Sequence, residues 1–170
     1  MKIRQELPAD YDEVYQLVKI SFDSNPETDG TVPDYLNDLR SKDEFIPELS
    51  LVTEMDGMLV GQIVLYKTPI VTPQGETLTE LLLSPISVHP DYFRRGIART
   101  MVEKALGMAT DMGYRAVFLC GDPEFYSKLG FAATHLHGIH HKNNPTSPYS
   151  MVRQLYPGAL DGITGTISTV

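Results

Sequence analysis

The sequence predicts an α/β fold in which helices cover a mixed β-sheet. In the first half of the chain, long apolar runs flank turn signals, a pattern typical of antiparallel hairpins. In the second half, short strand patterns alternate with helical patterns, which is typical of parallel strands joined by helices. The length of 170 residues suits one domain, which we expect to span residues 1–170.

In the first half, helical spacing of apolar residues predicts two helices after a short first strand. Asp10 offers an N-cap to the first helix, and Asp56-Gly57 is a strong signal for a two-residue hairpin turn. The expected elements are a strand at 3–5, helices at 10–22 and 32–42, and strands at 49–55 and 58–66.

A third long strand is expected at 77–88, and Ser84-Pro85 interrupts it. Proline cannot donate to a β-ladder, so it belongs at a sheet edge or a bulge. The interruption would leave backbone groups of residues 85–88 available to something other than a neighbouring strand.

In the second half, 96–111 has one apolar stripe and predicts an amphipathic helix. Asp122-Pro123-Glu124 carries the signals of a helix start, and Gly130 follows as a C-terminal cap. The remaining expected strands are 116–120, 131–134 and 149–155.

Composition argues against several classes of protein. A net charge of −8 argues against a nucleic-acid binder, and no apolar run approaches the ~20 residues of a membrane span. The start of the chain becomes acidic too early for a signal peptide. Cys120 is the only cysteine, which suits a reducing compartment, and we expect a cytoplasmic protein with Cys120 as a small buried strand residue.

The most informative segment is 82–99, where a strand passes through a short loop into a helix whose first turn holds Gly96 and Ala98. The first amides of a helix lack intrahelical partners and its dipole favours an anion, so a pyrophosphate is one expected ligand. Arg94, Arg95 and Arg99 add positive charge to this segment of an acidic chain. Spacing alone fits an ordinary strand–helix connection equally well.

This segment resembles the acetyl-CoA signature Gln/Arg-x-x-Gly-x-Gly/Ala of the GNAT superfamily of N-acetyltransferases, with Phe93 in the place of the first Gln/Arg. The stretch 121–131 resembles the later Phe-Tyr-x-x-x-Gly-Phe motif of the same family, and 155–165 resembles the tail of its YhbS-like branch. Two motifs in the right order are far more specific than either alone. The resemblance covers residues 3 to about 165.

The resemblance implies a GNAT-like α/β fold with six or seven strands, splayed between the fourth and fifth, and about four helices. It implies that amides of the glycine loop hold the pyrophosphate of acetyl-CoA, and that residues 86–88 pair with the pantetheine arm like an added strand. The expected cofactor-binding residues are Ile86, Ser87, Val88, Phe93, Arg94, Arg95, Gly96, Ile97, Ala98, Arg99 and Tyr126.

Acetyl transfer to an amine needs an oxyanion donor, a proton for the thiolate and a neutral amine. The amide of Val88 is a candidate for the first need. Tyr126 is the candidate for the second need, because the resemblance places this tyrosine beside the sulfur. Glu80 on the interrupted strand is a candidate base, with a water chain as an equal alternative. Further candidates for the base are His89, Glu54 and Asp122.

The acceptor is expected to be a small-molecule amine or a protein or peptide amine, and the resemblance mildly favours a homodimer. The cluster His135, His137, His140 and His141 lacks a Cys or carboxylate partner at useful spacing, so no metal is expected. A non-catalytic acyl-CoA binding or sensing module stays open as a rival. A nucleotide enzyme is disfavoured because Lys-Ser/Thr does not follow Gly96.

Overall fold

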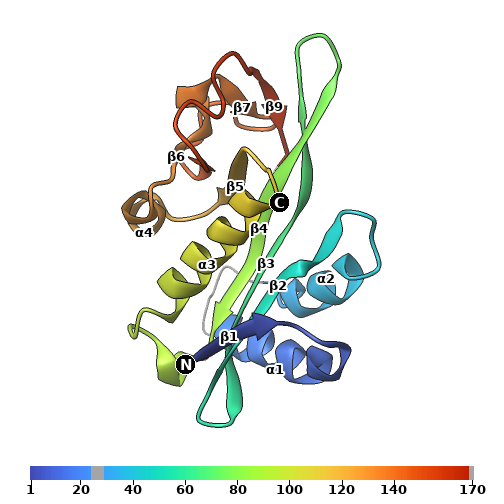
Figure 1. The fold of residues 1–170 in the computed structure, drawn as a ribbon, viewed down its shortest axis with the longest axis vertical. Coiled ribbons are helices and arrows are strands. Elements are labelled where there is room, and N and C mark those ends of the chain that lie inside the picture. The colour runs from blue at the N-terminus through green and yellow to red at the C-terminus, as the bar shows by residue number, and fades with distance from the viewer. Residues whose placement is uncertain (24–28, 169–170) are drawn as a thin grey trace. The chain divides into compact units, whose positions relative to one another are not determined.

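In the computed structural model, which describes residues 1–23 and 29–168, four α-helices and nine strands are formed (Figure 1). The helices are α1 (Tyr11–Phe22), α2 (Val32–Leu39), α3 (Ile97–Asp111) and α4 (Pro123–Tyr126). The strands are β1 (Lys2–Gln5), β2 (Phe45–Met55), β3 (Met58–Val71), β4 (Thr77–Val88), β5 (Ala116–Cys120), β6 (Ala132–Ala133), β7 (Ile139–His141), β8 (Ser150–Gln154) and β9 (Gly165–Ile167).

The strands form one mixed sheet in the order β1-β2-β3-β4-β5-β8-β6, and β9 pairs with β3 and β7. The pairing of β4 with β5 is parallel and, in the described part of the chain, covers only Leu81 with Val117 and Leu82 with Phe118. Strand β4 nevertheless continues to Val88. The predicted α/β fold with a break between the fourth and fifth strands is therefore confirmed.

Two compact units make up the chain, one with Met1–Leu65 and Ser84–Ala105, the other with Tyr66–Leu83 and Leu106–Val170. Strands β3 and β4 and helix α3 contribute residues to both. In the first unit, α1 and α2 lie side by side (Figure 1). Their buried faces include Val14, Val18 and Leu36, which are at most 1% exposed.

Helix α3 packs closely on β3 within the first unit. A Cβ added to Gly61 would lie 3.0 Å from Sδ and Cε of Met101, so the absence of a side chain at Gly61 lets the helix approach the strand. Ile97 and Met101 on this face are at most 2% exposed, as the apolar stripe predicted. This packing fixes the start of α3, where the phosphate is expected.

The turn between β2 and β3 is the predicted two-residue hairpin. Asp56 and Gly57 have φ values of 55° and 76°, which is the pair of positive φ angles that primed hairpin turns require. Asp56 thus lies at the tip of this hairpin.

Two expected details of the first unit are wrong. Asp10 makes no side-chain cap to α1, because its carboxylate accepts hydrogen bonds from both Nη atoms of Arg4, at 2.7 and 2.8 Å. The second helix ends at Leu39 rather than at residue 42. Arg40 there turns to a buried carboxylate, with Nη2 at 2.7 Å from Oε2 of Glu6.

In the second unit, β5 lies between β4 and β8, and the short strands β7 and β9 were not expected from the sequence. Cys120 is exposed, so the prediction that it is buried is wrong. It is the last residue of β5, where the chain leaves the covered part of the sheet. The strand expected at 131–134 is reduced to Ala132–Ala133, because a 3₁₀ turn begins at Thr134.

The hydroxyl of Thr53 on β2 is fully buried and, among the described residues, has no hydrogen-bond partner. Thr53→Val should therefore raise the free energy of unfolding by about 1 kcal/mol, because it removes an unsatisfied polar atom at constant shape. Thr134→Val is the matched control, since its buried hydroxyl lies 3.1 Å from that of Ser150, and should lower it by about 1 kcal/mol. Urea unfolding measures both, and destabilisation by Thr53→Val would contradict this reading.

Candidate functional site

The expected phosphate loop follows β4 directly in the first unit. The amide of His89 donates to the carbonyl of Val60 at 2.8 Å, which ties the loop to β3. A 3₁₀ turn over Pro90–Tyr92 follows, in which the amide of Tyr92 donates to the carbonyl of His89 at 2.9 Å. The turn carries the chain from the end of the strand to the start of α3.

The next amides are the feature that marks the site. In the part of the chain that the structure describes, the amides of Arg94, Arg95, Gly96, Ile97, Ala98 and Arg99 have no hydrogen-bond partner within the chain. Thr100 is the first residue of the helix whose amide is bonded, to the carbonyl of Gly96 at 3.0 Å. Arg94 and Gly96 have φ values of 62° and 77°.

Left-handed residues next to a helix start turn successive amides to one side and form an anion-binding concavity. The helix dipole adds positive potential at the same place. The side chains of Arg94, Arg95 and Arg99 are exposed around it, and their charges favour the same kind of ligand. We call residues 94–98 the phosphate loop below. Its chemistry suits a multiply charged anion such as a pyrophosphate.

The strand segment before the loop holds the other expected cofactor residues. Ser87 is 2% exposed and accepts a hydrogen bond from Nε2 of Gln62 at 2.9 Å, while Ile86 and Val88 are half-buried. This bond occupies one lone pair of the Ser87 hydroxyl and holds the side chain in the interior. Gln62 was missed by the sequence reasoning, because a lone glutamine in an apolar strand carries no motif.

Tyr126 lies in the second unit, at the end of the short helix α4. The predicted helix start is confirmed, since Oδ1 of Asp122 accepts the amide of Glu124 at 2.9 Å. The ring of Tyr126 meets Phe125 and Phe131 edge-to-face, at centroid distances of 4.9 and 5.7 Å. Burial, with a smaller contribution from the charge of Asp122, raises the pKa of Tyr126 to about 12. The phenol is therefore protonated at neutral pH.

Gly121, between β5 and α4, sets the position of that ring. A Cβ added to Gly121 would lie 2.5 Å from Cε2 of Tyr126, a separation that real Cβ atoms do not reach. The residue is glycine because the ring occupies the space of a side chain. The sequence gives this glycine no distinguishing signal, since it reads as an ordinary turn residue before the helix.

Glu80, the candidate base, lies on β4 in the second unit and is 2% exposed. Its Oε1 accepts the amides of Arg115 at 2.8 Å and of Ala116 at 3.3 Å, and its Oε2 lies 3.1 Å from Nη1 of Arg115. A base needs an open lone pair facing the substrate. These contacts favour a structural role for Glu80, in which it holds the start of β5.

The other candidates for the base are also engaged. Nδ1 of His89 accepts the amide of Asp91 at 3.1 Å, so the neutral ring carries its proton on Nε2 and has no free acceptor. Oε1 of Glu54 lies 3.1 Å from Nη2 of Arg4, and the carboxylate of Asp122 caps α4. These contacts make the three side chains less available as proton acceptors.

Two histidines of the 135–141 cluster make local contacts. Nδ1 of His141 accepts the amides of Asn143 and Asn144, and Nδ1 of His140 lies 3.1 Å from the carbonyl oxygen of Pro145. Within residues 1–23 and 29–168 there is no group of three His, Cys, Asp or Glu side chains placed to hold a metal ion.

The comparisons with known proteins agree on one family. The family model of the acetyltransferase (GNAT) domain matches residues 2–134 of the chain. The uncharacterized N-acetyltransferase YhbS of Escherichia coli K12 is 30% identical over 167 residues, which cover 98% of this chain and 95% of that protein.

Solved structures give the same result. The crystal structure of Escherichia coli YhbS in complex with CoA matches with a TM-score of 0.86 and 29% identity, over 99% of this chain and 89% of that one. A GNAT family acetyltransferase from Brucella melitensis in complex with acetyl-CoA matches with a TM-score of 0.80 and 25% identity, over 99% and 95% of the two chains.

The raised pKa of Tyr126 predicts a pH-dependent contribution to stability. A folded-state pKa of about 12 against an ordinary value of 10.0 stabilises the fold below pH 10, and this stabilisation is lost as the pH rises towards 12. The difference in free energy of unfolding between the wild type and Tyr126→Phe should therefore shrink over that window. Urea unfolding at several pH values measures it, and a constant difference would contradict the assignment.

Proposed function

The chain belongs to the GNAT family of acetyltransferases, and on this basis we propose that it moves an acetyl group from acetyl-CoA to an amine. The observation that carries the proposal is the row of unbonded amides in the phosphate loop, at the start of α3. CoA or acetyl-CoA is bound in the two related crystal structures, which supports the same donor here. The whole chain would act as one N-acetyltransferase domain.

In this proposal, the phosphate loop binds the pyrophosphate through the amides of Arg94, Arg95, Gly96 and Ala98. The exposed side chains of Phe93 and Arg99 and the backbone of Ile97 would complete the contact surface around it. The pantetheine arm pairs with the backbone of residues 86–88, in the manner of a strand added to a sheet. The early end of the β4–β5 pairing supports this, because β4 continues beyond it.

The reaction would be a direct transfer within a ternary complex. The amine nitrogen attacks the thioester carbonyl, and the amide of Val88 donates a hydrogen bond to the oxyanion. The C–S bond then breaks and the electron pair leaves on sulfur. The neutral amine loses one proton and the thiolate gains one. The reaction therefore releases the neutral CoA thiol and the amide.

Tyr126 would stabilise the departing thiolate. With a pKa of about 12, the phenol keeps its proton at neutral pH and donates a hydrogen bond to a thiolate more readily than it gives the proton up. A water chain would carry the proton from nitrogen to sulfur, because the carboxylate of Glu80 is already taken by Arg115 and Ala116.

The acceptor would be a small-molecule amine or an amine of a protein or peptide. The net charge of −8 favours an acceptor that arrives as a cation, which would lose one proton to solvent before it attacks as the neutral amine. Of the helices that the structure describes, none has the length and apolar character needed to span a bilayer. A single cysteine supports a cytoplasmic setting for the reaction, and a homodimer is the assembly that we expect.

Gly96→Glu tests the phosphate loop, because it places a negative charge and bulk among amides that bind an anion. Wild type should bind acetyl-CoA and desulfo-CoA with a Kd of roughly micromolar order, and Gly96→Glu should abolish both. Gly75→Glu is the matched control, since both glycines have positive φ and no atom within 4 Å of an added Cβ. Calorimetric titration measures binding, and equal loss in both variants would contradict the assignment.

Tyr126→Phe separates an acetyltransferase from a binding module. We expect kcat to fall by about 10²-fold with unchanged affinity for acetyl-CoA, measured as thiol release against a panel of amines. Gly121→Ala should lower kcat as well, because the added methyl group displaces the Tyr126 ring although the tyrosine itself is retained. Thiol release that no amine stimulates in the wild type, with intact binding, would favour the sensing module instead.

A further inference from the structure

We propose that Asp56 and Tyr92 are positioning residues for coenzyme A, which act by holding Arg95 and the phosphate loop in the conformation that binds phosphate. This inference rests on the proposed function. It concerns side chains outside the signature: Asp56 lies at the tip of the β2–β3 hairpin, and Tyr92 lies in the turn before the loop.

Three side chains form a continuous series of contacts from the hairpin to the loop. The hydroxyl of Tyr92 donates a hydrogen bond to Oδ2 of Asp56 at 2.9 Å. The guanidinium carbon of Arg95 lies 4.8 Å from the centroid of the Tyr92 ring, in a cation–π contact. Tyr92 thus connects the hairpin tip to an arginine of the loop.

The ring of Tyr92 is also held from a second side. His89 meets it edge-to-face, with a centroid distance of 5.8 Å and an interplanar angle of 89°. His89 itself is fixed, since its amide bonds to Val60 and its Nδ1 accepts the amide of Asp91. The position of Tyr92 is therefore set by contacts that all lie within the first unit.

The loop needs such support because its own backbone provides little. The amides of residues 94–98 have no partner within the described chain, and Arg94 adopts a left-handed conformation that a side chain disfavours. A loop ordered before the ligand arrives loses less conformational entropy on binding. The contact between Arg95 and Tyr92 keeps a positive charge beside the loop, so the Arg95 side chain need not be ordered when the ligand binds.

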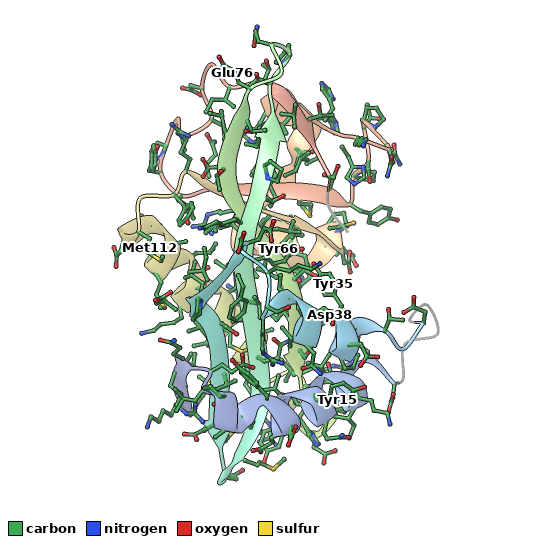
Figure 2. All side chains as sticks on the ribbon, turned by 90° about the vertical axis from the view of Figure 1, so that its right-hand side faces the viewer. Tyr15, Tyr35, Asp38, Tyr66, Glu76 and Met112 are labelled. Carbon is green, nitrogen blue, oxygen red and sulfur yellow. The ribbon has the colours of Figure 1, made fainter. Side chains whose placement is uncertain are left out.

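A simple alternative is that Tyr92 and Asp56 form one of the many surface pairs that do not affect function. The chain contains a matched pair for comparison. Tyr15 lies on α1 (Figure 2). Its hydroxyl donates to Oδ1 of Asp34 on α2 at 3.0 Å, and both pairs are partly exposed. Within the described residues, no arginine lies over the Tyr15 ring.

A double-mutant cycle on the full chain tests the proposal, with CoA as the probe in calorimetric titration. Tyr92→Leu should raise the Kd for CoA about tenfold in the wild-type background and less than about twofold in Arg95→Ala, because the tyrosine acts through the arginine. Tyr92→Phe keeps the ring and should raise Kd about threefold. The matched Tyr15→Leu should leave Kd unchanged in both backgrounds.

A second readout distinguishes positioning of charge from general stabilisation. The salt dependence of Kd should become shallower in Tyr92→Leu, as in Arg95→Ala, because both lose one ordered cation at the phosphates. Equal effects of Tyr92→Leu in the two backgrounds, or an unchanged salt dependence, would overturn the inference. Failure of the wild type to bind CoA would overturn the proposed function and this inference with it. That result differs from equal effects of Tyr92→Leu in the two backgrounds, which would overturn this inference alone.

Discussion

The backbone amides at the start of α3 impose the constraint on which the rest of the site depends. A helix leaves its first amides unbonded, and the turn through Arg94 and Gly96 extends this set backwards into the loop. Such groups are tolerated because they face solvent or a ligand. For them to meet one ligand together, the helix and the preceding strand must be fixed relative to each other. The close approach of Met101 to Gly61 and the bond from His89 to Val60 supply that fixation within the first unit.

The sheet contains a second feature of the proposed site. Strand β4 is a full partner of β5 at Leu81 and Leu82 and then continues without that pairing to Val88. A strand edge of this kind presents unpaired backbone groups that can pair with another strand. An extended pantetheine arm has the amide groups to occupy it, so in the proposed function the break that weakens the sheet would give the ligand its place.

Much of this arrangement could be predicted from sequence because its signals are local. Asp56-Gly57 suits a primed turn, which requires positive φ at two successive residues. Asp122-Pro123-Glu124 combines the cap and first-turn signals of a helix, so both elements appeared where expected. Other features depend on residues far apart in the chain. Glu80 reads as a reactive carboxylate until Arg115 is seen to take it, and Asp10 reads as a cap until Arg4 does the same. Gly121 and Gln62 have no local signal, since their reasons are the Tyr126 ring and the Ser87 hydroxyl.

In the proposed reaction, the position of Tyr126 would matter more than its acidity. Burial raises its pKa to about 12, which makes the phenol a poor proton donor to a thiolate of ordinary basicity but a permanent hydrogen-bond donor. Since a neutral amine would release as many protons as the thiolate takes up, the proposed transfer needs no net proton from the enzyme. It would need a neutral hydroxyl held where negative charge develops on sulfur. The contacts with Phe125 and Phe131 and the missing side chain at Gly121 hold the ring in one place, and the burial that results keeps the hydroxyl neutral.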